Sequence, residues 1–560
     1  MPRRALLDRH LGALIGLVLA AVALGPLLVA RGYALVGDMV FVPRAPLDRS
    51  LLGVSAAVPR AVPSDLVAAG LSHLLPGDLV QRLLLVAVFV VAASGGARLL
   101  RGCPVGARAV SAVVLAWNPY VAERLALGQW AVLLGYAALP WVVVAAARLR
   151  AGEPAWPALV LSLALAALTP TGGLVAGATA LLVVGGRRAV GVAAAWLVLD
   201  LPWLLPALLR PGGLPSTPEG IAAFAARADT PLGVLGSVLG LGGIWNADAV
   251  PPGRGAAGLV PVTLLLLAGV VWGVLLLLRG GVPLLPRRPA VGLVVAAAGS
   301  VVIAVAGVTP GLQNLLRDLV VHVPPAGLLR DGTRHLAPLA VLEAAALGLA
   351  AEALVARLPA VRTPAVVLAA VVPVLLLPRL AGGVSGRLHP VHYPDSWAAA
   401  RAAVSDDATP GALLALPWSA YRAPGWNRGR TVLDPATKAF DRRVVADDRL
   451  RVGTRIVPGE DRLAARLTPL AEGSGPLVAA AQAAGVRWVL VERDVPAARL
   501  VELRLGGATQ VVDAPELSLW RLPSPAALHE RTPPLGLLVA GDLAAALLVL
   551  GAVGLSARRQ

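Results

Sequence analysis

Long runs of apolar residues recur along the chain, and each ends at a short group of Pro, Gly, Arg or other polar residues. An α-helix needs about 20 mostly apolar residues to cross the hydrocarbon core of a bilayer, so these runs predict membrane spans. We expect about twelve spans. They lie near residues 11–31, 82–100, 106–118, 129–148, 155–169, 172–186, 189–209, 258–278, 289–308, 336–356, 363–379 and 535–556.

Three segments between these runs are long enough to form structured outer loops: 32–81, 210–257 and 309–335. The stretch "SDLVAAGLSHLL" in the first of them is amphipathic, which is typical of a helix lying along the membrane surface. The segment 210–257 is rich in Gly and Pro. We expect all three loops on the same side of the membrane.

The segment 380–533 has a different character, because its charge is higher and its apolar runs are shorter. Short strands are predicted at 412–418, 487–492, 509–513 and 517–522. Helices are predicted at 396–404 and 476–485. Their alternation indicates a small extracytoplasmic α/β domain. It follows a transmembrane domain over 1–379 and precedes a final span with a short tail over 534–560.

Composition agrees with a polytopic membrane protein. The 560 residues are 57% hydrophobic and 14% charged, and the mean hydropathy is +0.76. The formal net charge of +17 would suit a nucleic-acid partner. However, the arginines recur at the ends of apolar runs instead of on one soluble face, so we predict no nucleic-acid binding and a membrane-lipid environment.

The arginines also predict an orientation. With a cytoplasmic N-terminus, nearly every inside loop is basic, whereas the short outside turns at 119–128 and 169–172 contain only Arg124. The inside arginines are Arg3, Arg4, Arg9, Arg98, Arg101, Arg108, Arg148, Arg150, Arg187, Arg188, Arg279, Arg287, Arg288, Arg357, Arg362, Arg558 and Arg559. This pattern supports an even number of spans in the plasma membrane, with both termini cytoplasmic.

The ends and the single cysteine add little chemistry. The first apolar run is long and lacks a convincing small-x-small cleavage site, so we interpret it as an uncleaved helix. Cys103 is the only cysteine, which excludes an intrachain disulfide and a cysteine metal cluster. His389 and His392 are too few to predict a metal site without a third ligand.

Asp38 is the first candidate functional residue. It follows the first span within "GDMVFVP", on the predicted outer side, with apolar residues on both sides. A carboxylate held at the membrane surface could act as a general base or a ligand. The alternative is an ordinary loop aspartate that caps a turn after Gly37.

The turn "WNPYVAERLALGQW" is the second candidate. Asn118-Pro119 should end one helix and begin another, because the residue before proline avoids helical geometry and proline cannot donate its N–H. One interpretation places Arg124 at an exposed tip beside Asp38, where it binds a lipid phosphate with Glu123, Asn118 and Trp130 in support. The other makes Trp117, Tyr120 and Trp130 an interfacial belt and pairs Glu123 with Arg124 or a neighbour.

The third candidate is the cluster in "GLLRDGTRHLAPLAVLE". Arg330, Arg334 and His335 lie within about one helical turn of each other, so they could converge on an anion, with Asp331 in support. The alternative is that these basic side chains snorkel at a helix end. Weaker candidates for the same site are Arg317, Asp318 and His322.

Aromatic residues beside polar ones could contact a sugar or an acceptor, or they could dock the α/β domain onto the membrane domain. They are Trp245, Asp248, Trp418, Tyr421 and Trp426. We expect Asp447 and Asp448 to form a solvated turn. The sequence contains no P-loop, Rossmann glycine motif, G-x-S-x-G or H-E-x-x-H, which argues against an ATP-driven transporter or a standard hydrolase.

The many spans, the aspartate in the first outer loop and the C-terminal α/β domain together resemble the GT-C superfamily of membrane glycosyltransferases. The segments "NPYVAERLALGQWAVLLGYAALPW", "LLRDGTRHLAPL" and "GDMVFVP" look like those of large actinobacterial and archaeal GT-C-like proteins, a group that includes relatives of arabinofuranosyltransferases. Many members carry adjacent acidic residues in the first loop, whereas here Asp38 stands alone and Asp48 lies well beyond it.

The resemblance implies an inverting transfer of a sugar, such as arabinofuranose or mannose, from a polyprenyl-phosphate donor to a cell-envelope glycan or glycolipid at the outer face. Asp38 would be the base, and Arg124, Arg330, Arg334 and His335 would bind the donor phosphate. No cofactor is required. A divalent metal is compatible with the superfamily, but no ligand set for one is evident. Two alternatives stay open: a transporter or flippase of a lipid-linked sugar, and a catalytically silent scaffold of an envelope-synthesis complex.

Overall fold

The computed structural model describes residues 2–558 except 59–60, 212, 214–216 and 358. Small parts of the predicted outer loops 32–81 and 210–257 therefore fall outside the described residues. So do Arg559 and the side chains of Arg3, Arg4 and Arg9, which the predicted orientation used.

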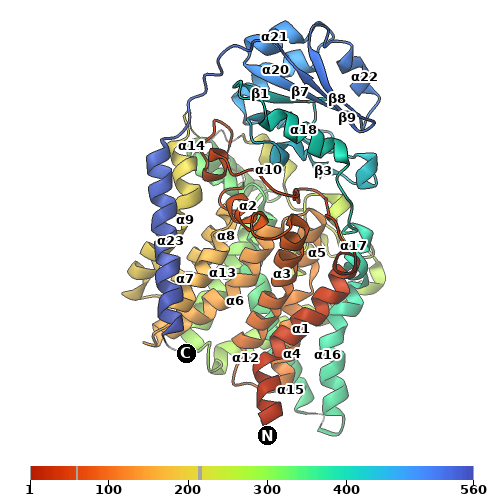
Figure 1. Ribbon diagram of the computed structural model, residues 1–560. Helices are drawn as coiled ribbons and strands as arrows, with labels where there is room; N and C mark the ends of the chain where they lie inside the picture. Colours follow the sequence, from red (N-terminus) through yellow and green to blue (C-terminus); the bar gives the residue numbers. More distant parts are fainter. Residues whose placement is uncertain (1, 59–60, 212, 214–216, 358, 559–560) are drawn as a thin grey trace.

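A bundle of apolar helices forms most of the molecule (Figure 1). Each of the twelve predicted apolar runs coincides with one of these helices. They are α1 (Pro2–Val29), α3 (Gly77–Leu99), α4 (Val105–Ala116), α6 (Trp130–Arg150), α7 (Trp156–Ala166), α8 (Pro170–Val184), α9 (Arg188–Leu209), α12 (Val260–Gly280), α13 (Arg287–Ala306), α15 (Ala337–Val355), α16 (Arg362–Leu376) and α23 (Leu535–Ala557).

The count of twelve spans is not confirmed. Among the described residues, 8 helices are long and apolar enough to cross a membrane, or up to 9 if the bent pair of α16 and the helical turns at Pro378–Gly386 forms one span. The helix α4 has 12 residues, which is about 18 Å, and the hydrocarbon core is about 30 Å thick. The helices α7 and α8 are also short, with 11 and 15 residues. These helices support a polytopic membrane protein.

Both termini lie at the end of the bundle that is farthest from the sheet domain (Figure 1). An even number of crossings, as predicted from the arginines, would produce this arrangement. Which face of the membrane each end meets stays a prediction.

Shorter helices cover the sheet-facing end of the bundle. The predicted surface stretch 64–75 contains α2 (Ser64–Ser72), and its position along a membrane stays a prediction. The other short helices at this end are η1 (Arg49–Leu52), α5 (Pro119–Ala126), α10 (Glu219–Ala223), α11 (Gly233–Leu239), η2 (Ala247–Ala249), η3 (Ala257–Leu259), α14 (Pro310–His322), η4 (Pro324–Leu329), η5 (Gly332–His335), η7 (Pro378–Leu380) and α17 (Ala381–Gly386), whereas η6 (Pro359–Val361) lies at the opposite end, between α15 and α16 (Figure 1).

The segment after α17 forms a mixed sheet with helices on both faces, which agrees with the predicted α/β character of this region. The sheet order is β4-β1-β7-β9-β8; β1 pairs in parallel with β4 and β7, and β9 pairs antiparallel with β7 and β8. Its strands are β1 (Ala412–Leu416), β4 (Val444–Val445), β7 (Val486–Glu492), β8 (Thr509–Asp513) and β9 (Leu517–Arg521). Two small hairpins join β2 (Tyr421–Arg422) to β3 (Val432–Leu433) and β5 (Leu450–Val452) to β6 (Arg455–Val457).

Alternation along β1 explains how the sheet attaches to the bundle. Successive side chains of a strand point to opposite faces. Leu413 and Ala415 belong to the large core that continues into the bundle, together with residues of α18 (Asp395–Ser405). Leu414 and Leu416 face a separate core that contains residues of α20 (Arg462–Glu472), α21 (Val478–Ala483) and α22 (Ala497–Glu502). The remaining helices there are η8 (Gly425–Asn427) and α19 (Ala436–Ala439). One face of the sheet is thereby packed toward the membrane domain (Figure 1).

Candidate functional site

The loop that carries Asp38 is a tight turn from Val36 to Met39, closed by a hydrogen bond from the Met39 N–H to the Val36 carbonyl (2.9 Å). The Asp38 N–H donates to the Leu127 carbonyl (2.8 Å), and the Leu433 N–H of β3 donates to the Gly37 carbonyl (2.8 Å). The turn is therefore held between the α5–α6 connection and the C-terminal domain.

Two glycines allow this close approach. Gly37 has φ 53°, and a Cβ there would lie 2.2 Å from the Leu127 carbonyl oxygen. Gly128 has φ 75°, and its Cβ would lie 2.1 Å from the Val36 carbonyl oxygen. Any other residue would clash with backbone at both positions and would be strained in the left-handed conformation. The expected proximity of the Asp38 loop and the 117–130 turn is thus built into the backbone.

The carboxylate of Asp38 accepts hydrogen bonds from two distant segments. Gln129 Nε2 donates to Oδ2 (3.1 Å), and the Tyr421 hydroxyl donates to Oδ1 (2.6 Å). Asp38 is nevertheless exposed. The side chain therefore does more than cap its own turn: it joins the membrane domain to the C-terminal domain while staying accessible to solvent.

Asn118-Pro119 separates α4 from α5, as predicted. Asn118 caps α5 through a hydrogen bond from the Val121 N–H to its side-chain oxygen (3.1 Å), and Pro119 is the first helical residue. The Asn118 amide nitrogen donates to Tyr136 Oη (2.7 Å). This role is structural, because Asn118 is buried.

The aromatic residues of this turn do not form an interfacial belt, so that interpretation is wrong. Trp117 and Tyr120 are essentially fully buried, and Trp130 is 7% exposed. Trp117 Nε1 donates to the Leu377 carbonyl (3.3 Å), and Trp130 packs on Phe41 with ring centroids 5.5 Å apart. These side chains hold the turn in the protein interior, and none of them faces lipid.

Arg124 was expected at an exposed tip, but its exposure is 0%. Its guanidinium pairs with Asp331 (3.2 Å) and donates to Gln129 Oε1 (3.0 Å) and Thr333 Oγ1 (2.6 Å). It also lies over the Tyr120 ring, 5.4 Å from the centroid. The helix α5 buries both of its charged side chains because the turn is enclosed by other segments. A lipid phosphate would not meet Arg124 in this arrangement.

Asp331 is the centre of a charged cluster. Arg334 Nε lies 3.0 Å from Asp331 Oδ2, and Trp245 Nε1 donates to the same oxygen (3.3 Å). Burial alone would raise the pKa of Asp331, but the guanidiniums of Arg124 and Arg334 outweigh it and hold the pKa below its ordinary value. Asp331 is therefore ionised, and the two arginines leave the cluster with one net positive charge.

The expectation that one anion binds all three basic side chains, Arg330, Arg334 and His335, is wrong. The Arg334 side chain is 34% exposed, and its Nε carries the ion pair to Asp331. His335 is 3% exposed, and burial lowers its pKa to about 4, so the ring is neutral near pH 7. Of the three, only Arg334 remains suited to a solvent-borne anion.

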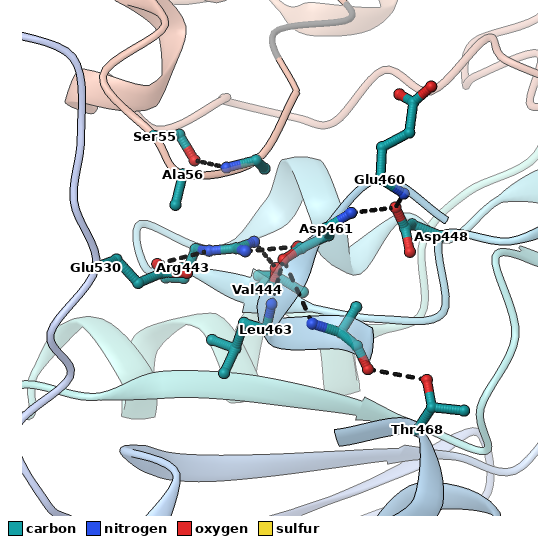
Figure 2. Close-up of polar contacts among 12 residues, drawn as sticks. Ser55, Ala56, Arg443, Val444, Asp448, Glu460, Asp461, Leu463, Thr468 and Glu530 are labelled. Carbon is teal, nitrogen blue, oxygen red and sulfur yellow. Dashed lines mark hydrogen bonds and ion pairs between the residues drawn. The ribbon is translucent and has the colours of Figure 1, made fainter. Parts of the chain in front are cut away.

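Arg330 instead binds the C-terminal domain, through an ion pair to Glu460 (3.3 Å). Figure 2 shows the loop that holds Glu460: the Glu460 and Asp461 N–H groups donate to Asp448 Oδ2 (2.5 and 2.8 Å), and Asp461 pairs with Arg443. Asp448 is thus part of an ordered contact and not of a solvated turn. Arg330 anchors the two domains, and its predicted role in donor binding gains no support from this contact.

Among the described residues, Glu123 forms no direct ion pair, either with Arg124 or with another cation. It is 2% exposed. Burial raises its pKa well above the usual range; the nearby Asp229 raises it further, whereas Arg254 opposes the rise. Asp229 itself is held by Arg254 (3.0 Å). Glu123 is therefore a neutral, buried acid, and Asp229 and Arg254 are members of the surroundings that sequence reasoning missed.

The remaining candidates for sugar or acceptor contact lie in different surroundings. Tyr421 reaches Asp38, and Trp245 reaches Asp331. Trp426 packs in an aromatic cluster with Tyr393 and Trp397, at centroid distances of 5.1 and 6.2 Å. Trp418 packs on the separate core of the sheet domain. Asp248 is exposed and its carbonyl accepts from Arg387. Only Tyr421 and Trp245 contact the charged network, and the sugar-binding role of all five stays a prediction.

One continuous polar network links the three sequence segments. It runs from Tyr421 to Asp38, Gln129, Arg124, Asp331 and Arg334. Sequence reasoning missed Gln129 and Thr333, although both lie within the quoted segments. In the part of the chain that the structure describes, no three His, Cys, Asp or Glu side chains are placed to hold a metal ion, and independence from a metal stays a prediction.

Comparison with known proteins identifies solved structures with a similar fold. No family model and no curated protein matches the sequence. The chain is similar to the cryo-EM structure of the arabinofuranosyltransferase AftD from mycobacteria, with a TM-score of 0.54 and 18% identity over 93% of this chain. A structure of a mutant of that enzyme matches with a TM-score of 0.50 and 18% identity over 92% of this chain. The chain spans 40% of the length of the first of these structures. The predicted resemblance in fold is therefore confirmed: this is an AftD-like membrane protein fold.

Proposed function

We propose that this protein is a glycosyltransferase of the GT-C type, which moves a sugar from a polyprenyl-phosphate donor to a hydroxyl of a cell-envelope glycan or glycolipid. The observation that carries the proposal is the exposed Asp38 carboxylate. Hydrogen bonds and ion pairs connect it through Gln129 and Arg124 to the Asp331–Arg334 cluster. The fold shared with AftD supports this class and favours arabinofuranose over mannose as the sugar.

Asp38 acts as the general base in this proposal. The acceptor hydroxyl replaces the Tyr421 hydroxyl, which already donates a hydrogen bond to Oδ1. As the acceptor oxygen attacks the anomeric carbon, Asp38 takes its proton. The attack comes from the face opposite to the phosphate, so the configuration at that carbon inverts.

The bond from the anomeric carbon to the phosphate oxygen breaks, and the polyprenyl phosphate leaves with the electron pair. A phosphate is already a good leaving group, so the reaction needs stabilisation of negative charge more than a second acid. Arg334 suits this role because it is partly exposed and uses Nε for Asp331, which leaves its two terminal nitrogens for phosphate oxygens. Asp331 positions Arg334 without cancelling the positive charge of the cluster.

The buried members of the network have supporting roles. Arg124 neutralises Asp331 and orders η5, while neutral His335 and Glu123 fill the interior. The C-terminal domain contributes Tyr421 and is tied down by the Arg330–Glu460 pair. The acceptor would thus bind at the junction of the two domains, on the extracytoplasmic side.

Purified protein in lipid nanodiscs tests the proposal, with a polyprenyl-phosphate sugar as donor and a synthetic envelope oligosaccharide as acceptor. The wild type should form product, and Asp38→Asn should abolish transfer while it keeps the amount and the thermal stability of the folded protein. Asp406→Asn, which changes another exposed carboxylate, is the matched control and should stay active.

Two results would contradict the proposal. Transfer that survives Asp38→Asn would remove the base. A wild type that forms no product but carries the lipid-linked sugar across a proteoliposome membrane would instead be a transporter.

A further inference from the structure

Gln129 occupies a position that helix capping does not explain. It is the residue before α6, where Ser, Thr, Asp or Asn are preferred because their short side chains cap the helix. Its side chain makes no capping hydrogen bond. It is 6% exposed, and its N–H donates to the Arg124 carbonyl (2.8 Å). The side chain is therefore available for another role, and the backbone hydrogen bond to Arg124 fixes the position of the residue.

The two partners of the Gln129 amide fix its orientation. The guanidinium of Arg124 has donors only, and an ionised carboxylate has acceptors only. The amide oxygen must therefore face Arg124 (3.0 Å), and the amide nitrogen must face Asp38 (3.1 Å). Rotation of the amide by half a turn would place two donors against each other on one side and two acceptors on the other.

We propose that Gln129 is the positioning residue of Asp38, and that it couples the base to the buried charge of Arg124. The hydrogen bond from Nε2 stabilises the ionised carboxylate and fixes its plane, and Arg124 polarises the amide in the sense that strengthens this bond. The inference rests on the proposed function, because it assigns Gln129 a task in the deprotonation of the acceptor.

The two oxygens of Asp38 then have different tasks. Oδ2 is held by the buried Gln129, which no substrate displaces. Oδ1 is held by Tyr421 of the C-terminal domain at an exposed site, and this partner can be exchanged for the acceptor hydroxyl. A base held at one oxygen and open at the other presents a fixed lone pair to its substrate.

Among the residues that the structure describes, few charged or titratable groups surround this pair. Tyr421 of β2 faces Asp38, and Arg124 of α5 faces Gln129. Behind Arg124 lie Asp331 of the 329–335 segment and Tyr120 of α5. Asp331 stays ionised, since its pKa is held low, and burial raises the pKa of Tyr120 to about 12. Neither Asp331 nor Tyr120 therefore changes its charge near neutral pH, where the pH–rate profile is measured.

Two variants separate the two hydrogen bonds of the amide. Gln129→Met keeps the size but removes both bonds. Gln129→Glu keeps an acceptor for Arg124, and so protects the fold, but removes the donor to Asp38 at neutral pH. Both should lower kcat by about 10- to 100-fold, the value of a hydrogen bond to a charged group. Gln129→Met should also move the acidic limb of the profile to higher pH, because the ionised carboxylate loses a donor.

Gln313→Met is the matched control, since the Gln313 amide donates to the Gly307 carbonyl (2.8 Å) away from the network; its kcat should equal that of the wild type. The inference is overturned if Gln129→Met leaves kcat and the acidic limb unchanged, or changes KM alone. Asp38→Asn is assayed in parallel. If it stays active, the proposed function fails; if it is inactive while both Gln129 variants behave as wild type, only this inference fails.

Discussion

Asp331→Asn is the substitution that tests the buried part of the network most severely. Asparagine has the same size and can still accept a hydrogen bond, so packing is conserved while one negative charge is removed. What remains are the guanidiniums of Arg124 and Arg334, which pair with Asp331 at 3.2 and 3.0 Å and would then face each other without a counter-charge.

The expected cost follows from burial. The side chains of Arg124 and Asp331 are 1% and 8% exposed. Removing one partner of a buried ion pair costs about 3–5 kcal/mol, because the other charge stays in a poorly solvated site. The Arg148–Glu153 pair is the matched control: its atoms are 2.6 Å apart, but its side chains are 29% and 47% exposed. Glu153→Gln should cost about 0–1 kcal/mol, the usual value of a surface pair.

Denaturant-induced unfolding in mixed micelles, followed by tryptophan fluorescence, measures both costs in one chain. Asp331→Asn should lower the free energy of unfolding by several times as much as Glu153→Gln does. If the two costs agree to within about 1 kcal/mol, then Arg124 is either solvated or neutralised by another group, and the enclosed network described above is incorrect.

Three further tests, with four substitutions, address the substrate-facing and titrating groups. Tyr421→Phe should lower the KM for the acceptor and leave kcat intact in steady-state assays, because it removes the hydroxyl that competes for Asp38 Oδ1; a fall in kcat would instead make Tyr421 catalytic. Arg334→Ala should raise the KM for the donor by about tenfold or more, while Arg330→Ala, which breaks the domain contact to Glu460, should leave it unchanged; equal effects would refute the assignment of the phosphate to Arg334. Glu123→Gln mimics the protonated acid: because the pKa of Glu123 is raised in the folded state, the wild type loses stability as the pH rises above the ordinary value of a glutamate. The variant should lose less between about pH 5 and about pH 8 in thermal unfolding, and parallel curves for the two proteins would show that Glu123 is ionised.

The local secondary structure and the position of the polar segments could be predicted from the sequence. The Asn-Pro boundary between α4 and α5 was predicted from the backbone restrictions of proline, and the structure confirms it. The four predicted strands of the C-terminal domain are present as β1, β7, β8 and β9, since short β-branched and aromatic runs between turn residues favour extended chain. The three polar segments were also expected to meet at one end of the bundle, and the hydrogen bonds of the network connect them.

The burial of the charged side chains and the identity of their partners could not be predicted from the sequence. Arg124 and Asp331 are 207 residues apart, and nothing in either segment states that the two side chains neutralise each other. Arg124 was therefore expected at the surface. His335 and Arg334 are neighbours in sequence, yet one is buried and the other is partly exposed, because the short helix η5 turns them to different sides.

The number of spans stays unconfirmed because hydropathy measures composition and not helix length. Proline interrupts the apolar region between 155 and 186: Pro157 lies near the start of α7 and Pro170 is the first residue of α8. The resulting helices are apolar but too short to cross a bilayer alone. The Gln129 side chain was missed for a related reason, since a single amide carries no sequence signal until its two partners are known.

A cryo-EM structure of the protein in nanodiscs, with a polyprenyl-phosphate sugar bound, tests the central claim most directly. The account predicts that the phosphate contacts the terminal nitrogens of Arg334 and that the anomeric carbon faces the Oδ1 side of Asp38, with Gln129 still bound to Oδ2. A donor bound elsewhere, with its sugar out of reach of Asp38, would contradict the account.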